Sequence, residues 1–163
     1  MAQYFFTENG YQKLRDEIDR LERLLKNDIA KEIATAAAHG DLKENGEYHA
    51  AKEKQVLTAA KLRQLQERFS GANVVRKEEL LPVESVTFGK RIKIRDTKTG
   101  NERVCTILGE GETDPENGVI AYNSPLASAL IGHNKGETVD VQLPVGMKTF
   151  QILEVEFAEG YQD

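Results

Sequence analysis

Several residue types that often stabilise or functionalise a small protein are scarce in this chain of 163 residues. It has no tryptophan, four prolines, three histidines and a single cysteine, Cys105. One cysteine cannot form an internal disulfide, and so few histidines beside it cannot build a zinc cluster of the usual Cys/His spacing. We therefore expect Cys105 to be a small buried apolar residue.

Long uncharged stretches are missing as well. No run of about 18 residues is free of charged side chains, and the N-terminal sequence MAQYFFTENG lacks the basic and apolar segments of a secretion signal. The sequence thus predicts no membrane segment and a cytoplasmic location. The net charge of −5 is uneven, because residues 1–77 carry 14 basic and 12 acidic side chains whereas residues 78–163 carry 8 and 15. Phosphate repels the acidic second part, which is a poor candidate for direct binding of duplex DNA.

The strongest positive signal is a heptad-like apolar pattern near the N-terminus. Its members follow one another in steps of three and four, and they are Tyr11, Leu14, Ile18, Leu21 and Leu25. Ile29 and Ile33 continue the stripe with one slip, which predicts a long helix. Thr7 is a suitable N-cap, and His39-Gly40 is where we expect this helix to stop.

A second pattern with the same spacing follows. It consists of Tyr48, Ala51, Gln55, Thr58, Leu62, Leu65 and Phe69, and it ends at Ser70-Gly71. Two helices with complementary apolar seams and a short connection predict an antiparallel coiled-coil hairpin. We assign residues 1–75 to this hairpin and residues 40–47 to its acidic tip.

From Ala72 onward the pattern has a period of two with turn signals. We expect strands at residues 90–96, 102–108, 119–122, 138–143 and 149–157. Ser124 and Pro125 mark the N-cap and first position of a short helix that ends at Gly132. The predicted fold class is α+β with two domains, the second being an antiparallel sheet with a short helix over residues 76–163.

The predicted tip places two carboxylates three residues apart, Asp41 and Glu44. One interpretation is structural, because this spacing resembles a capping box at the start of the second helix. The other is chemical, because two exposed carboxylates can supply part of the octahedral oxygen shell of Mg²⁺. Such a site needs waters and ligands from another macromolecule. Spacing alone leaves both interpretations open.

Two blocks of sequence resemble a known family. The tip segment at residues 38–53, AHGDLKENGEYHAAKE, is similar to the tip signature of the Gre family of bacterial transcript cleavage factors, and more to the GreA type than the GreB type. The second block reads SPLA at residues 124–127, ALIG at 129–132 and GETV at 136–139. The likeness covers the whole chain.

This resemblance implies a function. It implies a coiled-coil hairpin and an FKBP-like domain that docks on RNA polymerase, with the hairpin tip inserted into the secondary channel. There the factor stimulates the polymerase's own cleavage of the 3′ end of backtracked nascent RNA. Asp41 and Glu44 correspond to the catalytic carboxylates and share a Mg²⁺ ion held mainly by the polymerase. The protein is then not itself an enzyme, binds no metal stably alone, and is expected to be a monomer.

The resemblance also assigns supporting residues. Those that contact RNA or support the tip are Lys43, Asn45, Tyr48 and Lys52. The expected polymerase-docking residues are Ser124, Pro125, Leu126, Leu130, Ile131 and Gly132, with the apolar members largely in the core and one of them exposed. Packing in the seam is an alternative role for Tyr48, and a solvated helix face is an alternative for the lysines.

Two other functions compete with transcript cleavage. Relatives of the same shape inhibit polymerase by occupying its channel, but the intact Asp41-Leu42-Lys43-Glu44-Asn45 tip favours cleavage. An FKBP-like domain also suggests a prolyl isomerase. Residues 78–163 supply few aromatic side chains for the deep pocket that this activity needs, and likeness of fold is a weak reason to infer activity.

Overall fold

The structure, a computed structural model, describes residues 3–162 and divides the chain into two units. One unit is a helical hairpin formed by Gln12–Gly71. Within the described residues, the other unit combines residues 3–11 with residues 72–162. The sequence predicted a division after residue 75, so the two descriptions differ mainly in where the first residues of the chain belong.

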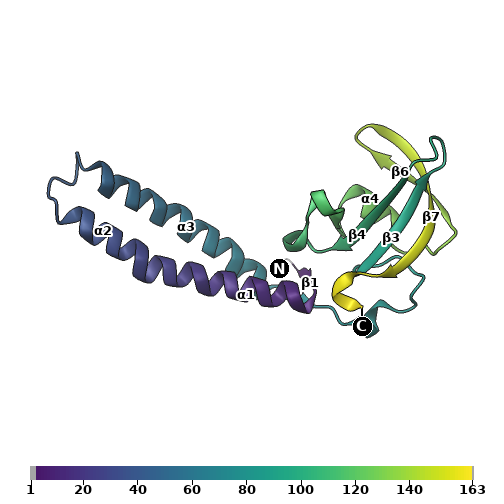
Figure 1. Ribbon diagram of the computed structural model, residues 1–163, viewed down its shortest axis with the longest axis horizontal. Helices are drawn as coiled ribbons and strands as arrows, with labels where there is room; N and C mark the ends of the chain where they lie inside the picture. The colour runs from purple at the N-terminus through teal and green to yellow at the C-terminus, as the bar shows by residue number, and fades with distance from the viewer. Residues whose placement is uncertain (1–2, 163) are drawn as a thin grey trace. The chain divides into compact units, whose positions relative to one another are not determined.

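The hairpin consists of two antiparallel arms. The first arm contains α1 (Glu8–Arg23), a π-helical turn (Leu24–Ile29) and α2 (Ala30–Ala37), and the second arm is α3 (Gly46–Ser70) (Figure 1). The buried seam residues are Leu14, Ile18, Leu21, Ile29, Ala36 and Ala51. The predicted hairpin is therefore confirmed. None of the helices described within residues 3–162 is both long and apolar enough to cross a bilayer.

The π-helical turn explains the slip in the apolar pattern. A π turn closes its hydrogen bonds one residue later than an α turn, so it absorbs one extra residue. Ile29 lies at the end of this turn and is fully buried, and Ala36 follows seven residues later on the same face. The first arm thus keeps its apolar face toward α3 on both sides of the insertion.

The globular unit is built on one five-stranded sheet. The strands are β3 (Lys90–Asp96), β4 (Glu102–Leu108), β5 (Val119–Ala121), β6 (Thr138–Leu143) and β7 (Gly146–Phe157). Their order in the sheet is β5-β4-β3-β7-β6. All neighbours are antiparallel except β4 and β5, and β7 begins three residues before the predicted strand.

One face of this sheet forms the core with the short helix α4 (Pro125–Leu130). The register places Ile92 opposite Cys105 on one side and Val155 on the other, and the core also contains Leu126 and Leu130. Cys105 is fully buried, as predicted, and burial raises the pKa of its thiol. It is therefore a packing residue rather than a reactive nucleophile.

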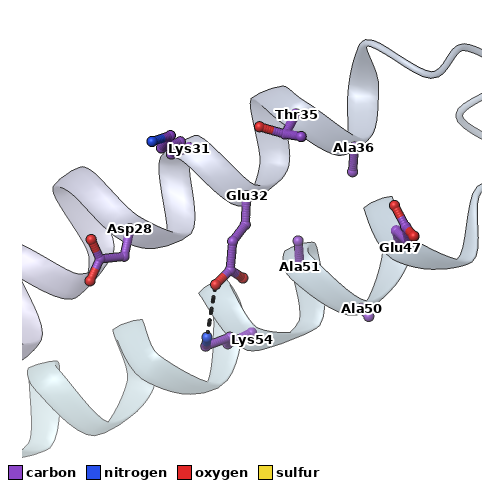
Figure 2. A pocket seen from close by; sticks show the side chains of 9 residues that line it. All are labelled: Asp28, Lys31, Glu32, Thr35, Ala36, Glu47, Ala50, Ala51 and Lys54. Carbon is purple, nitrogen blue, oxygen red and sulfur yellow. Dashed lines mark hydrogen bonds and ion pairs between the residues drawn. The ribbon is translucent and has the colours of Figure 1, made fainter.

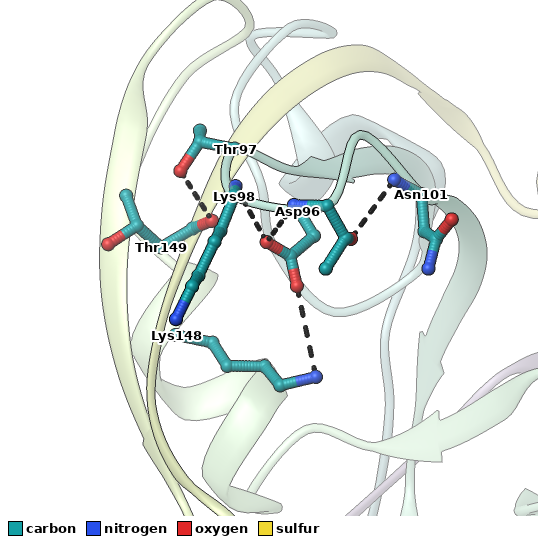
Figure 3. Close-up of polar contacts among 7 residues, drawn as sticks. Asp96, Thr97, Lys98, Asn101, Lys148 and Thr149 are labelled. Atoms are coloured by element: carbon teal, nitrogen blue, oxygen red, sulfur yellow. Dashed lines mark hydrogen bonds and ion pairs between the residues drawn. The ribbon is translucent and has the colours of Figure 1, made fainter.

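The turn between β3 and β4 is organised by one carboxylate. Asp96 Oδ1 accepts the backbone N–H groups of Lys98 and Thr99 at 2.9 and 3.3 Å, and Oδ2 lies 3.8 Å from Lys148 Nζ (Figure 3). The bond from the Lys98 backbone holds the pKa of Asp96 below its ordinary value. The side chain thus replaces main-chain partners that the tight turn cannot provide.

A buried lysine fixes another loop of the globular unit. Lys90 has no exposed surface, and its Nζ donates to the carbonyl oxygens of Pro82, Val83 and Ser85 at 3.0, 3.0 and 2.7 Å. Burial lowers the pKa of the Lys90 ammonium, whereas its three carbonyl acceptors favour the charged form. An ammonium has three donors, so every one of them is satisfied.

Two short strands were not predicted from the sequence. β1 (Tyr4–Phe6) and β2 (Ala72–Val74) pair in parallel at the two chain ends of the hairpin. The Phe5 ring packs edge-on against Tyr122, with centroids 5.1 Å apart. These contacts explain why the first residues of the chain group with the globular unit.

The start of α1 is capped twice. Thr7 Oγ1 accepts the Gly10 N–H at 3.0 Å, which confirms the predicted N-cap. The Glu112 carboxylate then accepts the Thr7 hydroxyl at 2.6 Å and the Thr7 N–H at 3.0 Å. Thr7 is buried, so neither group has water as a replacement partner.

This arrangement predicts a reversal in the effect of a helix substitution at Gly10. Alanine normally stabilises a helix interior by up to about 1 kcal/mol relative to glycine. Here an added Cβ would lie 2.2 Å from Glu112 Cδ, so the carboxylate would have to move away from Thr7. Losing those bonds costs about 1–3 kcal/mol, and we expect Gly10→Ala to lower the unfolding temperature.

In a Glu112→Ala background the same Gly10→Ala change should raise the unfolding temperature, because no carboxylate is left to displace. Scanning calorimetry on the four proteins of this cycle measures both effects, and Glu116→Ala serves as the control for loss of an exposed carboxylate. Stabilisation by Gly10→Ala in both backgrounds would contradict the double cap.

Candidate functional site

The two acids lie on the turn that joins α2 to α3. Asp41 and Glu44 are both exposed. The chain reverses through two residues with positive φ, Gly40 at +80° and Asp41 at +39°. Aspartate and asparagine tolerate this left-handed region better than most other residues. The conformation thus suits an aspartate at position 41, and it leaves the carboxylate in solvent.

Asn45 connects the two arms across this turn. Its Oδ1 accepts the Tyr48 N–H at 3.0 Å, and its Nδ2 donates to the Ala36 carbonyl at 2.6 Å. The N-cap of α3 is therefore Asn45. The capping-box interpretation of Asp41 and Glu44 is wrong, because both acids precede the cap.

The peptide bond before Glu44 is held at both polar atoms. The Lys43 carbonyl lies 2.8 Å from His49 Nε2, and the Glu44 N–H donates to the Asp41 carbonyl at 3.3 Å. The two acidic residues are thus linked through the main chain.

Small residues leave a groove between the arms near the tip. It has a volume of about 600 Å³, and Ala36 of α2 and Ala51 of α3 point toward one another there (Figure 2). Glu32 and Lys54 form an ion pair across it at 3.2 Å, with both side chains about half exposed. Such an exposed pair contributes little stability. Ala36 and Ala51 are the two residues here that are buried between the arms.

The tip alone does not contain a complete metal site. Among residues 3–162, no three His, Cys, Asp or Glu side chains gather in a way that could hold an ion. Mg²⁺ prefers six oxygen ligands, which is more than the predicted pair of carboxylates, Asp41 and Glu44, can supply. The donor chemistry fits this ion, but further ligands have to come from elsewhere.

The other residues predicted at the tip divide into two groups. Lys43 and Lys52 are exposed, and Lys52 Nζ donates to Gln55 Oε1 at 3.4 Å. Tyr48 is half-buried, and its ring meets the His49 ring edge-on at 5.7 Å between centroids. The lysines are available to a polyanion, whereas Tyr48 is partly engaged within the hairpin.

The predicted docking residues lie on and beside α4 in the globular unit. Ser124 caps the helix by accepting the Ala127 N–H at 3.4 Å. Pro125 and Gly132 are exposed, and Ile131 is half-buried.

Two members of the predicted docking set lie in the core of the globular unit. Leu126 and Leu130 are only 6% and 0% exposed, because both side chains enter the core beneath the sheet. Both leucines are thus core residues, as expected for most of the apolar members, and half-buried Ile131 is the apolar residue of the set that a partner can reach. The exposed part of the helix consists of Pro125 and Ser128.

His49 is the tip residue whose contact the sequence did not predict. Its bond to the Lys43 carbonyl depends on the path of an irregular turn, which helical spacing does not encode. The only available signal was the position of His49 in the first turn of the second helix.

Comparison with known proteins gives a consistent relationship over most of the chain. Residues 4–74 match the family described as "Transcription elongation factor, N-terminal", and residues 81–157 match "Transcription elongation factor, GreA/GreB, C-term". Transcription elongation factor GreA of Helicobacter pylori strain Shi470 is 42% identical over 151 residues, which cover 93% of this chain and 92% of that protein.

Two further relatives extend the comparison. Transcription elongation factor GreA of Xanthomonas axonopodis pv. citri is 37% identical over 153 residues, covering 94% of this chain and 97% of that protein. The crystal structure of GreA factor homolog 1 of Thermus thermophilus is 20% identical with a TM-score of 0.45, covering 95% of this chain and 99% of that one.

The double role of Asn45 generates a test of tip order. Asn45→Asp keeps an acceptor for the Tyr48 N–H but places a negative oxygen against the Ala36 carbonyl. Losing this donor costs about 1–3 kcal/mol, which corresponds to roughly 10- to 100-fold faster amide exchange in the turn. Hydrogen exchange at residues 40–45 measures the effect.

Asn45→Ser is the matched control, since serine also caps helices but carries no charge. It should loosen the turn less than Asn45→Asp, and circular dichroism should show that both variants keep their helices. Wild-type exchange rates in Asn45→Asp would mean that the bond to Ala36 does not stabilise the tip.

Proposed function

Because this chain belongs to the GreA/GreB family of transcription elongation factors, we propose that it binds RNA polymerase and inserts its hairpin tip into the secondary channel. There it stimulates the polymerase's own cleavage of the 3′ end of backtracked nascent RNA. The main support is the pair of exposed carboxylates, Asp41 and Glu44, on a turn held by side-chain hydrogen bonds.

In this proposal the protein completes an active site instead of forming one. Asp41 and Glu44 would hold a Mg²⁺ ion together with ligands from the polymerase. When bound, Mg²⁺ activates water and stabilises charge on phosphoryl oxygens. Two carboxylates supply only part of the six-oxygen shell that Mg²⁺ prefers, which suits a site shared with the polymerase.

The remaining residues of the tip have separate roles. Asn45 fixes the turn through Ala36 and Tyr48. Lys43 and Lys52 present exposed ammonium groups that can approach the phosphates of the extruded RNA. The hairpin thus presents cationic side chains to the RNA, next to the two carboxylates that would hold the shared Mg²⁺ ion.

We place the polymerase contact of the globular unit on the exposed side of α4 and its flanks. Pro125, Ser128 and Gly132 are exposed there, and Ser124 and Ile131 are half-buried. Leu126 and Leu130 support this surface from below by filling the core.

The rival proposal is a regulator that occupies the channel and inhibits without cleavage. It requires the same hairpin but not the two acids. Adding the protein with Mg²⁺ to stalled, backtracked transcription complexes separates the two functions. Released 3′-terminal RNA fragments support cleavage, whereas slowed elongation without fragments supports inhibition.

The acids generate the central prediction. Asp41→Asn and Glu44→Gln should each lower the saturating cleavage rate by at least about 100-fold, because a ligand to the shared metal is lost. Asparagine also tolerates positive φ, so position 41 keeps its conformation. The concentration that gives half-maximal binding should change by less than about twofold, because the tip adds little contact area.

Fragment release and a separate binding measurement on the same complexes check both parts of this prediction. Glu47→Gln, an exposed acid in the first turn of α3, is the control. If the double variant Asp41→Asn, Glu44→Gln cleaved at the parental rate, the acids would have no role in the chemistry.

A substitution on the docking surface should weaken binding and leave the saturating cleavage rate nearly unchanged, which is the opposite of the effect expected at the acids. Ser128→Glu places a charge on the exposed side of α4 without disturbing Leu126 or Leu130. We expect the concentration for half-maximal cleavage to rise about tenfold, with little change in the rate at saturation. Glu116→Gln, on another exposed turn, is the control, and an unchanged affinity for Ser128→Glu would move the contact away from α4.

A further inference from the structure

The peptide unit between Lys43 and Glu44 is hydrogen-bonded at both of its polar groups. Its carbonyl oxygen lies 2.8 Å from His49 Nε2, and its N–H donates to the Asp41 carbonyl at 3.3 Å. A peptide unit is planar, and its C=O and N–H groups point to opposite edges of the plane. Hydrogen bonds at both groups therefore fix the orientation of the unit. The Cα atom of Glu44 lies in the same plane, so its position depends on this orientation.

The histidine that makes this bond stands on a regular element. His49 belongs to the first turn of α3, and its backbone N–H donates to the Asn45 carbonyl at 3.1 Å. Its ring also meets the Tyr48 ring edge-on, with 5.7 Å between centroids. The imidazole therefore links the irregular turn to the regular helix α3 and holds the turn in place relative to it.

The chemistry of the contact fixes which atom carries the proton. A carbonyl oxygen only accepts, so Nε2 must be the donor. Both the neutral Nε2–H tautomer and the imidazolium satisfy this requirement, and the bond therefore does not depend on the charge of His49. Its ring is committed to the main chain and is not free to act on substrate through Nε2.

We propose that His49 is a positioning residue for Asp41 and Glu44. Its imidazole contacts the carbonyl of the peptide unit before Glu44, and the N–H of the same unit donates to the Asp41 carbonyl. His49 thus sets the relative placement of the two carboxylates without touching RNA or metal. This inference rests on the proposed cleavage function for its catalytic consequence, but not for its structural part.

Three substitutions separate this role from alternatives. His49→Ala removes the donor, and alanine is a good helix former, so α3 is retained. His49→Gln restores an N–H at a similar distance from the main chain. His39→Ala removes the exposed histidine on the other side of the turn and is the matched control.

The first measurement uses the free protein. The nitrogen-15 NMR order parameter of the Glu44 amide should fall below about 0.6 in His49→Ala, the range of a flexible backbone, and should stay near about 0.85 in His49→Gln and His39→Ala. An unchanged order parameter in His49→Ala would overturn the proposal.

The second measurement is cleavage by backtracked transcription complexes. His49→Ala should lower the rate at saturating factor by about 10- to 100-fold, because small misplacement of reacting groups has effects of this size. The concentration for half-maximal stimulation should stay within about twofold, because His49 makes no polymerase contact in this proposal. His49→Gln should recover most of the rate.

The outcomes distinguish the two hypotheses. If wild-type protein releases no RNA, the proposed function fails and the catalytic role of His49 fails with it, while the order parameter still decides the structural part. If wild type cleaves and His49→Ala cleaves equally fast, the positioning role is wrong and the proposed function stands. A rise in the half-maximal concentration at an unchanged saturating rate would make His49 a binding residue, which also overturns the proposal.

Discussion

The reversal between α2 and α3 imposes the constraint on which the candidate site depends. A helix that ends leaves carbonyl groups without partners, and one that begins leaves N–H groups without partners. At an exposed turn with little apolar contact, packing cannot hold these ends together. Asn45 satisfies one group of each kind, since its amide donates to Ala36 and accepts from Tyr48. One neutral amide thus connects both arms and leaves the acids of the turn free.

The same solution recurs in the globular unit. Lys90 gathers three carbonyl groups of one loop, Asp96 accepts two N–H groups of a tight turn, and Glu112 completes the cap at Thr7. In each case one polar side chain hydrogen-bonds main-chain groups of an irregular segment, where no regular helix or strand supplies their partners. Because unsatisfied buried polar groups are costly, these side chains decide where the loops lie. The apolar core then determines how the regular elements pack, and the loops follow from the polar contacts.

Sequence reasoning succeeded where a period could be read and failed where a contact crosses the chain. The steps of three and four gave the hairpin, and alternation placed β3, β4 and β6 at their observed bounds. β1 and β2 are too short for any period, and the partner of Thr7 lies 105 residues away. Spacing alone left two interpretations of Asp41 and Glu44 open, and the resemblance of the tip segment to a known signature selected them. The bond of His49 to Lys43 depends on a turn whose path no spacing rule describes. The core position of Leu126 and Leu130 agrees with the expectation for most apolar residues of α4, but spacing did not say that Ile131 would be the one left half-buried.

The two units therefore obtain their order in different ways, and this difference suits the proposed function. The globular unit has a continuous apolar core, so an exposed residue of α4 can change without affecting stability. The tip has almost no core, and its conformation depends on a few hydrogen bonds around Asn45 and His49. A turn built this way can present two carboxylates to another molecule's active site without a bulky base of packed side chains beneath them. Its weakness is that each bond matters, because no packing remains to hold the acids once one of these bonds is lost.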